Sequence, residues 1–227
     1  MQLRETLLNL AITSVLVLIV ALVAMLLRES RPGPVAAIPI AMAQPTSETP
    51  GSRELTPDFQ PFADVSLVVS RSNEADTLRI SVGGKEEIFR LYFIDALEAS
   101  WTHPQRIAEQ SRYFGNASRE DIVAMGEEAM NYVTTVLSSR PFELRTRWEG
   151  VPNMSRYYGL IVVEIEPGRR VYLADLLVQQ GYARLNGLTT YLPDDRRDIE
   201  TYIHELQVLA REARTQRRGI WSRARSS

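Results

Sequence analysis

The stretch 88–98 constrains the fold more than any other part of this chain, because it alternates apolar and polar side chains and ends in carboxylates. Successive side chains of a strand point to opposite faces, so Phe89, Leu91 and Phe93 share one face, and Arg90, Tyr92 and Ile94 lie on the other. An arginine in a half-buried strand is costly to desolvate. Asp95 and Glu98 follow at the end of the run. The stretch therefore predicts a strand that carries a charged site.

Other runs of strand and helix character surround this stretch. Strand-like runs at 65–69, 76–82 and 87–94 predict a three-stranded meander, with Gly83-Gly84 as a hairpin turn. Further predicted elements are a helix at 119–139 preceded by a capping Ser118, strands at 142–148 and 156–165, and helices at 173–180 and 194–217. This is the element order of an OB-fold. We therefore predict an α+β, mainly β, domain on a five-stranded OB-fold barrel, with about three helices.

The N-terminal run 7–27 carries no charge and is long enough to cross a membrane. One interpretation is an uncleaved membrane anchor over residues 1–29. The other is a signal peptide that is cut after the small-x-small sequence Ala41-Met42-Ala43. The first predicts a domain that is held at the membrane and faces the periplasm or the cell exterior. The second predicts a secreted domain.

Composition places the domain boundaries. Residues 30–62 are rich in Pro, Ser and Thr, which is typical of a flexible linker. We predict the folded domain over residues 63–222, followed by a short basic tail at 223–227. No internal repeat is visible in the sequence, and we expect a monomer.

Charge and residue usage exclude several function classes. The formal net charge of -2 gives the chain no general attraction to nucleic acid, so any basic surface must be local. The absence of cysteine excludes disulfides, zinc–thiolate sites and cysteine nucleophiles. His103 and His204 are the only histidines, which leaves histidine-dependent hydrolysis little to work with.

Four motifs in order, within residues 64–222, resemble the staphylococcal nuclease (thermonuclease) family. They are Asp76 fourteen residues before Arg90, then Arg90-x4-Asp95-x2-Glu98, then Leu173-x-x-Leu176-Leu177-Val178-x-x-Gly181-x-Ala183, and finally Gly219-Ile220-Trp221-Ser222. Leu97 stands where proline is usual in the second motif. One such motif alone is a weak signal, but four at compatible spacing favour the fold of this family.

The resemblance implies hydrolysis of phosphodiesters in DNA or RNA with a bound calcium ion, Ca²⁺. It makes Asp76 and Asp95 the carboxylate ligands of that ion and the carbonyl of Ala96 a third oxygen ligand. It makes Glu98 the group that positions or deprotonates the attacking water, and Arg90 the group that holds the phosphate. The chemistry of these residue types agrees, because calcium prefers hard oxygen donors and a guanidinium binds phosphate oxygens in pairs.

One position departs from the family pattern. The family has a second catalytic arginine immediately before a glycine on the fifth strand, and here Tyr158 precedes Gly159. Arg156 lies two residues earlier on the same face of that strand and is our candidate replacement, with Arg147 as a weaker one. Losing one donor to the transition state typically lowers the rate by about 10² to 10³. The alternative function is therefore a weak or inactive module that binds nucleic acid or a protein partner at the membrane.

Three tyrosines are candidates for substrate binding. Tyr157, Tyr158 and Tyr191 have rings on which nucleobases can stack. Tyrosine is also common at the edge of an apolar core, where its ring is buried and its hydroxyl finds a partner. The sequence leaves both interpretations open for all three.

Overall fold

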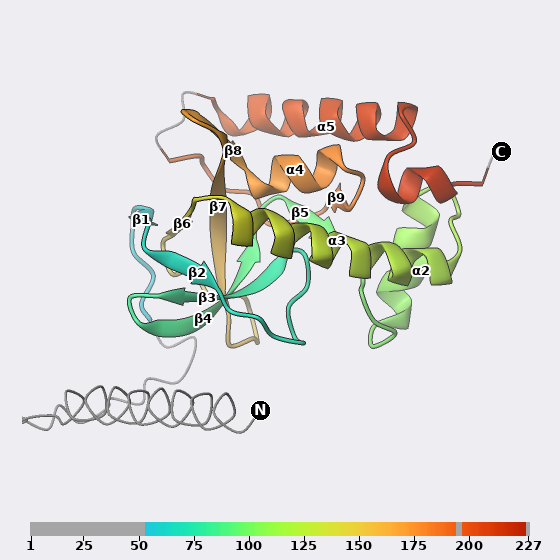
Figure 1. Ribbon diagram of the computed structural model, residues 1–227. Helices are drawn as coiled ribbons and strands as arrows, with labels where there is room; N and C mark the ends of the chain where they lie inside the picture. The colour runs from blue at the N-terminus through green and yellow to red at the C-terminus, as the bar shows by residue number, and fades with distance from the viewer. Residues whose placement is uncertain (1–52, 194–196, 226–227) are drawn as a thin grey trace, which may run out of the picture. The chain divides into compact units, whose positions relative to one another are not determined.

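The computed structural model describes residues 53–193 and 197–225 (Figure 1). The predicted anchor or signal segment and most of the predicted linker lie outside these ranges. Within them, none of the helices combines the length and the apolar character that a membrane span requires. The described residues form a mixed α+β domain with a mostly β core, so the predicted fold class is confirmed at this level.

The elements follow one another along the chain as labelled in Figure 1. The strands are β1 (Gln60–Phe62), β2 (Val65–Leu67), β3 (Thr77–Val82), β4 (Lys85–Leu91), β5 (Ile94–Ala96), β6 (Phe142–Thr146), β7 (Tyr157–Glu166), β8 (Arg169–Tyr172) and β9 (Ala183–Leu185). The helices are α2 (Pro104–Tyr113), α3 (Arg119–Ser139), α4 (Leu173–Gln179) and α5 (Ile199–Thr215), and a 3-10 turn spans Gly219–Arg223.

The main sheet has the strand order β1-β6-β7-β4-β3-β2, with β8 paired to β7, and β5 and β9 form a separate pair. The predicted meander is confirmed as β2, β3 and β4, joined through antiparallel pairs. At its hairpin, Gly83 and Gly84 have φ of 58° and 76°, which glycine adopts without strain. β4 and β7 are parallel, and their register places Arg90 beside Tyr158. This pair of strands therefore forms the centre of the region that the sequence marks as a site.

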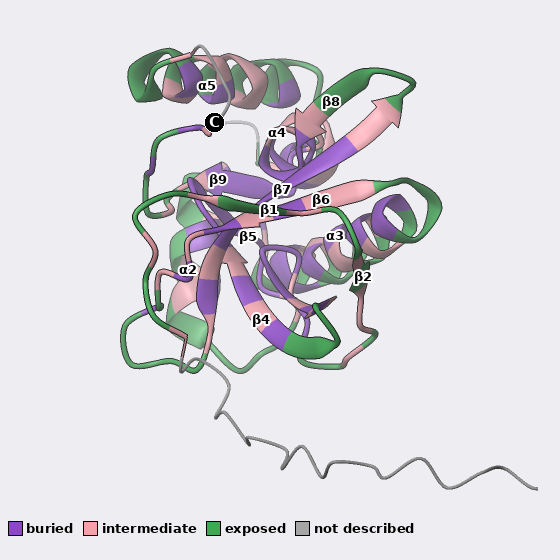
Figure 2. Ribbon diagram, turned by 90° about the vertical axis from the view of Figure 1, so that its left-hand side faces the viewer, coloured by how far each residue is buried: buried purple, intermediate pink, exposed green. Residues whose placement is uncertain are grey.

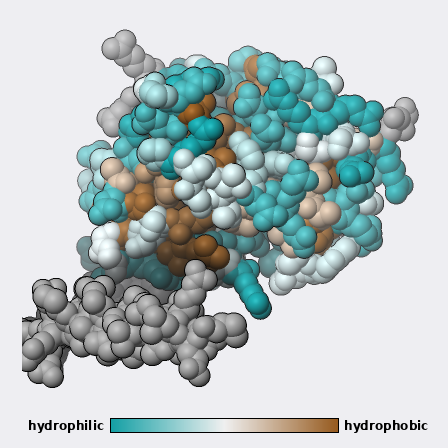
Figure 3. Space-filling model, viewed as in Figure 1, coloured by the Kyte–Doolittle hydropathy of each residue, from teal (hydrophilic) through white to brown (hydrophobic). Residues whose placement is uncertain are grey.

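The sheet does not close into a barrel within the described residues, because its pairing ends at β1 on one side and at β2 on the other. β2 and β6 approach each other without pairing. A cavity of about 380 Å³ lies there, lined by β2, the end of α3 and the start of β6. Figure 3 shows hydrophobic side chains on this face, and Val69 just after β2 is 87% exposed. The described part of the domain is thus an open sheet with four helices, rather than a closed barrel with about three.

The folded domain includes residues that the composition assigns to the linker. β1 pairs antiparallel with β6. The N–H of Thr56 donates to the carbonyl of Arg147 at 2.8 Å. The ring of Phe59 meets Tyr92 edge-on, with ring centroids 5.9 Å apart. The few apolar residues at the end of the Pro-rich segment are therefore enough to attach it to the sheet.

The helices begin close to the predicted signals. The hydroxyl of Ser118 accepts a hydrogen bond from the N–H of Asp121 at 3.0 Å, which is the predicted cap of α3. α5 begins after Asp198, several residues later than predicted, and the carboxylate of Asp198 caps it. α2 begins at Pro104, because proline is favoured in the first turn of a helix, where its missing N–H costs no hydrogen bond. α4 packs against β7, and α5 packs on α4 (Figure 1).

Two apolar clusters hold these elements together. The larger one lies between the main sheet and the helices α3, α4 and α5, and Figure 2 shows its buried residues along β7 and α4. The smaller one joins the end of β5 to α2, α3 and the 3-10 turn, and contains Leu97, Ile107, Phe114 and Trp221. Because Leu97 and Ile107 pack in the same cluster, the apolar contacts fix α2 directly against the charged residues that follow β5.

Candidate functional site

Arg90 lies near the end of β4, between Thr77 of β3 and Tyr158 of β7. Its Nη2 atom is 3.2 Å from Oδ2 of Asp76 and 3.0 Å from Oδ1 of Asp95. Burial by itself lowers the pKa of Arg90, but these two carboxylates outweigh burial and the pKa is raised above its usual value. The guanidinium is therefore permanently charged and held between two acids.

A strained turn at Phe93 brings Asp95 to this position. Phe93 has a φ of 72°, a left-handed conformation that residues other than glycine rarely adopt. Its N–H donates to the carbonyl of Leu188 at 2.8 Å, and its buried ring meets Tyr202 edge-on at 4.9 Å. Such strain persists only where the surroundings enforce it. The turn redirects the chain from β4 into β5, and Asp95 consequently returns to the side of Arg90.

Asp95 binds three arginines at once. Its Oδ1 accepts hydrogen bonds from Nη2 of Arg90 at 3.0 Å and from Nη2 of Arg106 at 2.6 Å. Its Oδ2 accepts a hydrogen bond from Nε of Arg184 at 2.8 Å. Asp95 is buried, and burial raises the pKa of a carboxyl, but the arginines, led by Arg106, outweigh burial and hold the pKa of Asp95 below its usual value. Asp95 is therefore ionised and anchors three cations.

Glu98 follows β5 and is also buried. Its Oε1 lies 2.8 Å from Nε of Arg106, and its Oε2 lies 3.2 Å from Nδ1 of His103. Burial raises the pKa of Glu98, and the positive charge of Arg106 offsets only part of that rise. A buried carboxyl with a raised pKa is a better proton acceptor than an exposed one. A raised pKa is compatible with the role of water-activating base that the family resemblance implies for Glu98.

Two helices fix the backbone around Glu98. A Cβ at Gly126 of α3 would lie 2.3 Å from the Glu98 carbonyl oxygen, so only glycine permits this close approach. On the other side, the fully buried Gln110 of α2 accepts a hydrogen bond from the Glu98 N–H at 3.0 Å. The same amide donates to the carbonyl of Ala96 at 2.7 Å. The position of Glu98 is thus set by packing and not by its charge alone.

The structure brings most of the predicted site together. Asp76, Arg90, Asp95 and Glu98 meet in one group with Arg106, and we call these five residues the charged cluster. Asp76 immediately precedes β3, Asp95 and Glu98 come from β5 and the segment after it, and Arg106 comes from α2. The predicted family motif therefore describes a real spatial group, to which α2 adds a member.

The oxygens of the predicted calcium ligands are already engaged. Asp76 accepts hydrogen bonds from the hydroxyl of Thr77 and from the N–H of Ala96, both at 2.9 Å. The carbonyl of Ala96 accepts from Gln110, and the carboxylate of Asp95 faces guanidinium groups. Calcium takes about six to eight oxygen ligands and would have to displace these positive charges. The three residues as arranged do not fit the ion, and the calcium site stays a prediction that requires rearrangement.

Neither predicted replacement for the second arginine joins the charged cluster. Arg156 immediately precedes β7 and is not an ion-pair partner of any carboxylate of the cluster in the described structure. Arg147 binds Glu149 instead, with Nη2 2.6 Å from Oε2, and the hydroxyl of Tyr92 donates to the same oxygen at 2.6 Å. The second guanidinium beside Arg90 is that of Arg106, from another element.

Sequence reasoning missed Arg106, Gln110 and Arg184. Arg106 and Gln110 are four residues apart on α2, a spacing that places both on one face of a helix. A firm helix prediction over 104–113 would have found them. Arg184 lies in β9, a strand of only 3 residues that is too short to give a periodic signal.

Tyr157 does not have the position that a stacking role requires. It is 0% exposed, and its ring packs in the core against Phe89 and Trp148. Its hydroxyl accepts a hydrogen bond from the N–H of Arg53 at 2.6 Å. A nucleobase could reach this ring only if the core opened, so the structure corrects this part of the predicted substrate site.

The other two predicted tyrosines lie in a partly exposed group of rings. Tyr158 is half-buried and stacks on Tyr92, with ring centroids 5.0 Å apart and an interplanar angle of 29°. Tyr191 is 39% exposed and meets Phe59 edge-on at 5.1 Å. We call Phe59, Tyr158 and Tyr191 the aromatic surface. Its member Tyr158 is the β7 neighbour of Arg90, so the surface adjoins the charged cluster.

Comparison of the sequence with protein-family models gives no match, and comparison with curated proteins gives none. The geometry unites the motif residues Asp76, Arg90, Asp95 and Glu98. The resemblance to the staphylococcal nuclease family therefore rests on the four sequence motifs and their spacing.

Proposed function

We propose that this domain binds a nucleic-acid phosphodiester at the charged cluster and hydrolyses it. The observation that carries the proposal is the pair of guanidinium groups, from Arg90 and Arg106, that meet at the carboxylate of Asp95 next to Glu98. Phosphodiester cleavage needs positive charge at the non-bridging oxygens and a base within reach of water. These residues supply both requirements in one place.

In this proposal, Arg90 and Arg106 bind the phosphate, and Glu98 accepts the proton of the attacking water. Arg106 performs the task that the family pattern gives to an arginine at the position of Tyr158. The side chain of Arg106 is 32% exposed, whereas that of Arg90 is 16% exposed, so Arg106 is the more accessible of the two. A phosphate that enters would exchange carboxylate contacts of these arginines for its own oxygens, since both groups suit a bidentate guanidinium.

The family resemblance also implies calcium as a cofactor. Asp76, Asp95 and Ala96 would be its ligands and the ion would supply positive charge to the phosphate, but the residues as arranged do not fit it. The proposal keeps the OB-fold order of elements, because the meander, the intervening α3 and the pair β6–β7 follow one another in that order. For location, we keep the apolar run 7–27 as a membrane anchor with the domain outside the cell or in the periplasm. Secretion after cleavage at 41–43 is the alternative.

The direct test incubates the full-length protein with single-stranded DNA and RNA, with calcium and with a chelator. We expect cleavage that the chelator abolishes and that Glu98→Gln lowers by about 10² or more, since a general base contributes typically 10² to 10⁴. Arg170→Gln is the matched control, because Arg170 pairs with Glu143 on β6, outside the charged cluster. Absence of cleavage, or equal cleavage by wild type and Glu98→Gln, would contradict the proposal.

A second candidate function is a module that binds nucleic acid or a protein partner without cleaving. The observation in its favour is that Tyr158, at the position of the family's second arginine, packs on Tyr92 as an ordinary ring. This alternative predicts saturable binding of single strands without turnover, with an affinity that Glu98→Gln leaves unchanged. The same assay separates the two functions, because only hydrolysis produces shorter strands.

A further inference from the structure

A second group of metal-ligating side chains lies at the edge of the charged cluster. Glu74 precedes β3, Glu98 follows β5, and His103 directly precedes α2. Each offers one ligand atom, and these atoms lie within 4.8 Å of one another. Only Glu98 belongs to the charged cluster, and none of the three is among the calcium ligands that the family resemblance implies. The group therefore requires its own explanation.

Protein cations balance the charges in this group only in part. Arg106 contacts Oε1 of Glu98, whereas Oε2 faces His103. The carboxylate of Glu74 forms no side-chain hydrogen bond and no ion pair within the described parts of the chain; Arg90 acts on its charge without direct contact. Two carboxylates this close repel each other unless a cation or a proton lies between them. The unpaired Glu74 points to a cation as the missing partner.

The donor atoms select the kind of cation. Two carboxylate oxygens and one imidazole nitrogen suit divalent first-row transition metals, whereas calcium and magnesium are bound by oxygen. We propose that Glu74, Glu98 and His103 bind a divalent transition metal, for which Zn²⁺ is the probe of choice because it ranks high in affinity for such donors. The calcium site implied by the family would require displacement of three arginines, whereas this group requires only that the His103–Glu98 hydrogen bond be replaced by the metal.

The site would be open on one side. The side chain of His103 is 50% exposed and that of Glu98 is 1% exposed, so the group reaches from the interior to the surface. Three protein ligands with solvent on the remaining side are the arrangement of reactive rather than structural metal sites. Trp101, 53% exposed and two residues before His103, provides a fluorescence signal close to the metal.

The test is a calorimetric titration of the full-length protein with Zn²⁺ and, separately, with Ca²⁺, with tryptophan fluorescence as a second readout. We expect one Zn²⁺ per chain, bound at least about 100-fold more tightly than Ca²⁺. His103→Ala should weaken Zn²⁺ binding by about 100-fold or more, since even groups behind a ligand matter by about 10- to 100-fold. Glu74→Gln should weaken it similarly.

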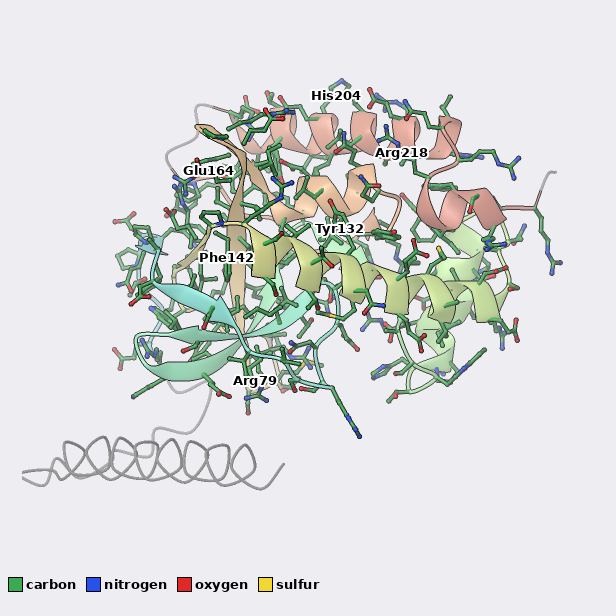
Figure 4. The ribbon with its side chains drawn as sticks, in the orientation of Figure 1. Arg79, Tyr132, Phe142, Glu164, His204 and Arg218 are labelled. Carbon is green, nitrogen blue, oxygen red and sulfur yellow. The ribbon has the colours of Figure 1, made fainter. Side chains whose placement is uncertain are left out.

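The second histidine supplies a matched control. His204 lies on the outer side of α5 and is exposed (Figure 4), so His204→Ala should bind Zn²⁺ as the wild type does. Equal Zn²⁺ affinity in His103→Ala and His204→Ala would overturn the proposal, and so would unchanged affinity in Glu74→Gln. Absence of saturable Zn²⁺ binding would also overturn the proposal and would mean that His103 and Glu98 form only a hydrogen bond. No nucleic acid is present, so the result is independent of the proposed nuclease activity.

Discussion

On the β4 side of the parallel strand pair, Arg90 lies among carboxylates, whereas on the β7 side its neighbour Tyr158 lies among aromatic rings. The family pattern would place an arginine on both strands. Here the second guanidinium comes from Arg106 of α2. The charged cluster thus concentrates its cations on one side, and the aromatic surface offers the other side to an apolar group. A nucleotide has both parts, a charged phosphate and a flat base.

The two regions should also respond differently to mutation. Members of the charged cluster share partners, so the removal of one carboxylate leaves several buried charges without compensation. Members of the aromatic surface contribute contact area and ring pairing. Truncation of any one ring should therefore remove only a small part of the interaction energy. Charged substitutions should therefore have large and coupled effects, and aromatic ones small and separable effects.

The largest effect is expected from Asp95→Asn. The change removes the charge that binds Arg90, Arg106 and Arg184, and breaking a buried pair costs about 3 to 5 kcal/mol of unfolding free energy. Urea unfolding of the full-length protein measures it. The control Asp64→Asn changes an exposed carboxylate and should stay within about 0.5 kcal/mol of the wild type. Similar results for both variants would mean that the cluster is not a coupled unit.

The next effect concerns activity and tests which region holds the second catalytic arginine. Arg106→Gln should lower single-turnover cleavage by about 10² to 10³, the usual cost of losing one donor to the transition state. Arg156→Gln should leave cleavage near the wild-type rate. Arg106→Lys should recover little, because an ammonium cannot contact Asp95 and Glu98 with a planar fork. A greater loss for Arg156→Gln than for Arg106→Gln would identify Arg156, next to β7, as the second catalytic arginine.

The same comparison explains what the sequence could predict. Asp76, Arg90, Asp95 and Glu98 were predicted because their spacing resembles the motifs of a known family. The pairing of β3 with β4 brings the first two together. Arg106 and Arg184 reach the site from α2 and β9. The position of α2 depends on packing in the apolar cluster that contains Ile107 and Leu97. Packing between distant elements leaves no periodic signal in a sequence.

For the tyrosines of β7, the sequence likewise did not show which side chain is buried. Tyr157 and Tyr158 are adjacent, and alternation predicts that they face opposite sides of β7. It does not say which side is the core, and the structure shows that Tyr157 faces it. The sequence also did not show whether the sheet closes into a barrel. Closure depends on pairing between β2 and β6, which the sequence of neither strand determines alone.

A smaller effect should follow from changes in the aromatic surface. Tyr158→Ala should weaken binding of single-stranded DNA by about 1 to 3 kcal/mol, the usual cost of losing a stacked base contact. Tyr158→Phe keeps the ring and should bind almost as the wild type does. Fluorescence anisotropy of labelled strands, measured in the Glu98→Gln background to prevent cleavage, provides the comparison. Equal weakening by Ala and Phe would assign the effect to the hydroxyl and not to stacking.

The smallest effect is a difference in pH dependence between the two regions. The pKa of Asp95 is lowered in the folded state, so its stabilisation is present above the unfolded value of about 3.9 and is lost as pH falls. The pKa of Tyr92 is raised, first by burial and then by Glu149, whose carboxylate accepts a hydrogen bond from the Tyr92 hydroxyl at 2.6 Å. Its stabilisation is therefore complete below the unfolded pKa of about 10 and is lost as pH rises.

Tyr92→Phe tests this last difference. The variant should lose about 1 kcal/mol of unfolding free energy at neutral pH, the usual worth of a hydrogen bond, because Glu149 loses one donor and keeps Arg147. The difference in unfolding free energy from the wild type should shrink between about pH 9 and 11. Over this range the wild type loses the stabilisation by the Tyr92 hydroxyl, which the variant does not have at any pH. Unfolding free energies across about pH 2 to 11 measure it, with Asp95→Asn as the counterpart whose difference from the wild type shrinks only at acid pH. A constant difference for Tyr92→Phe would mean that its hydroxyl is not linked to the charge of Glu149.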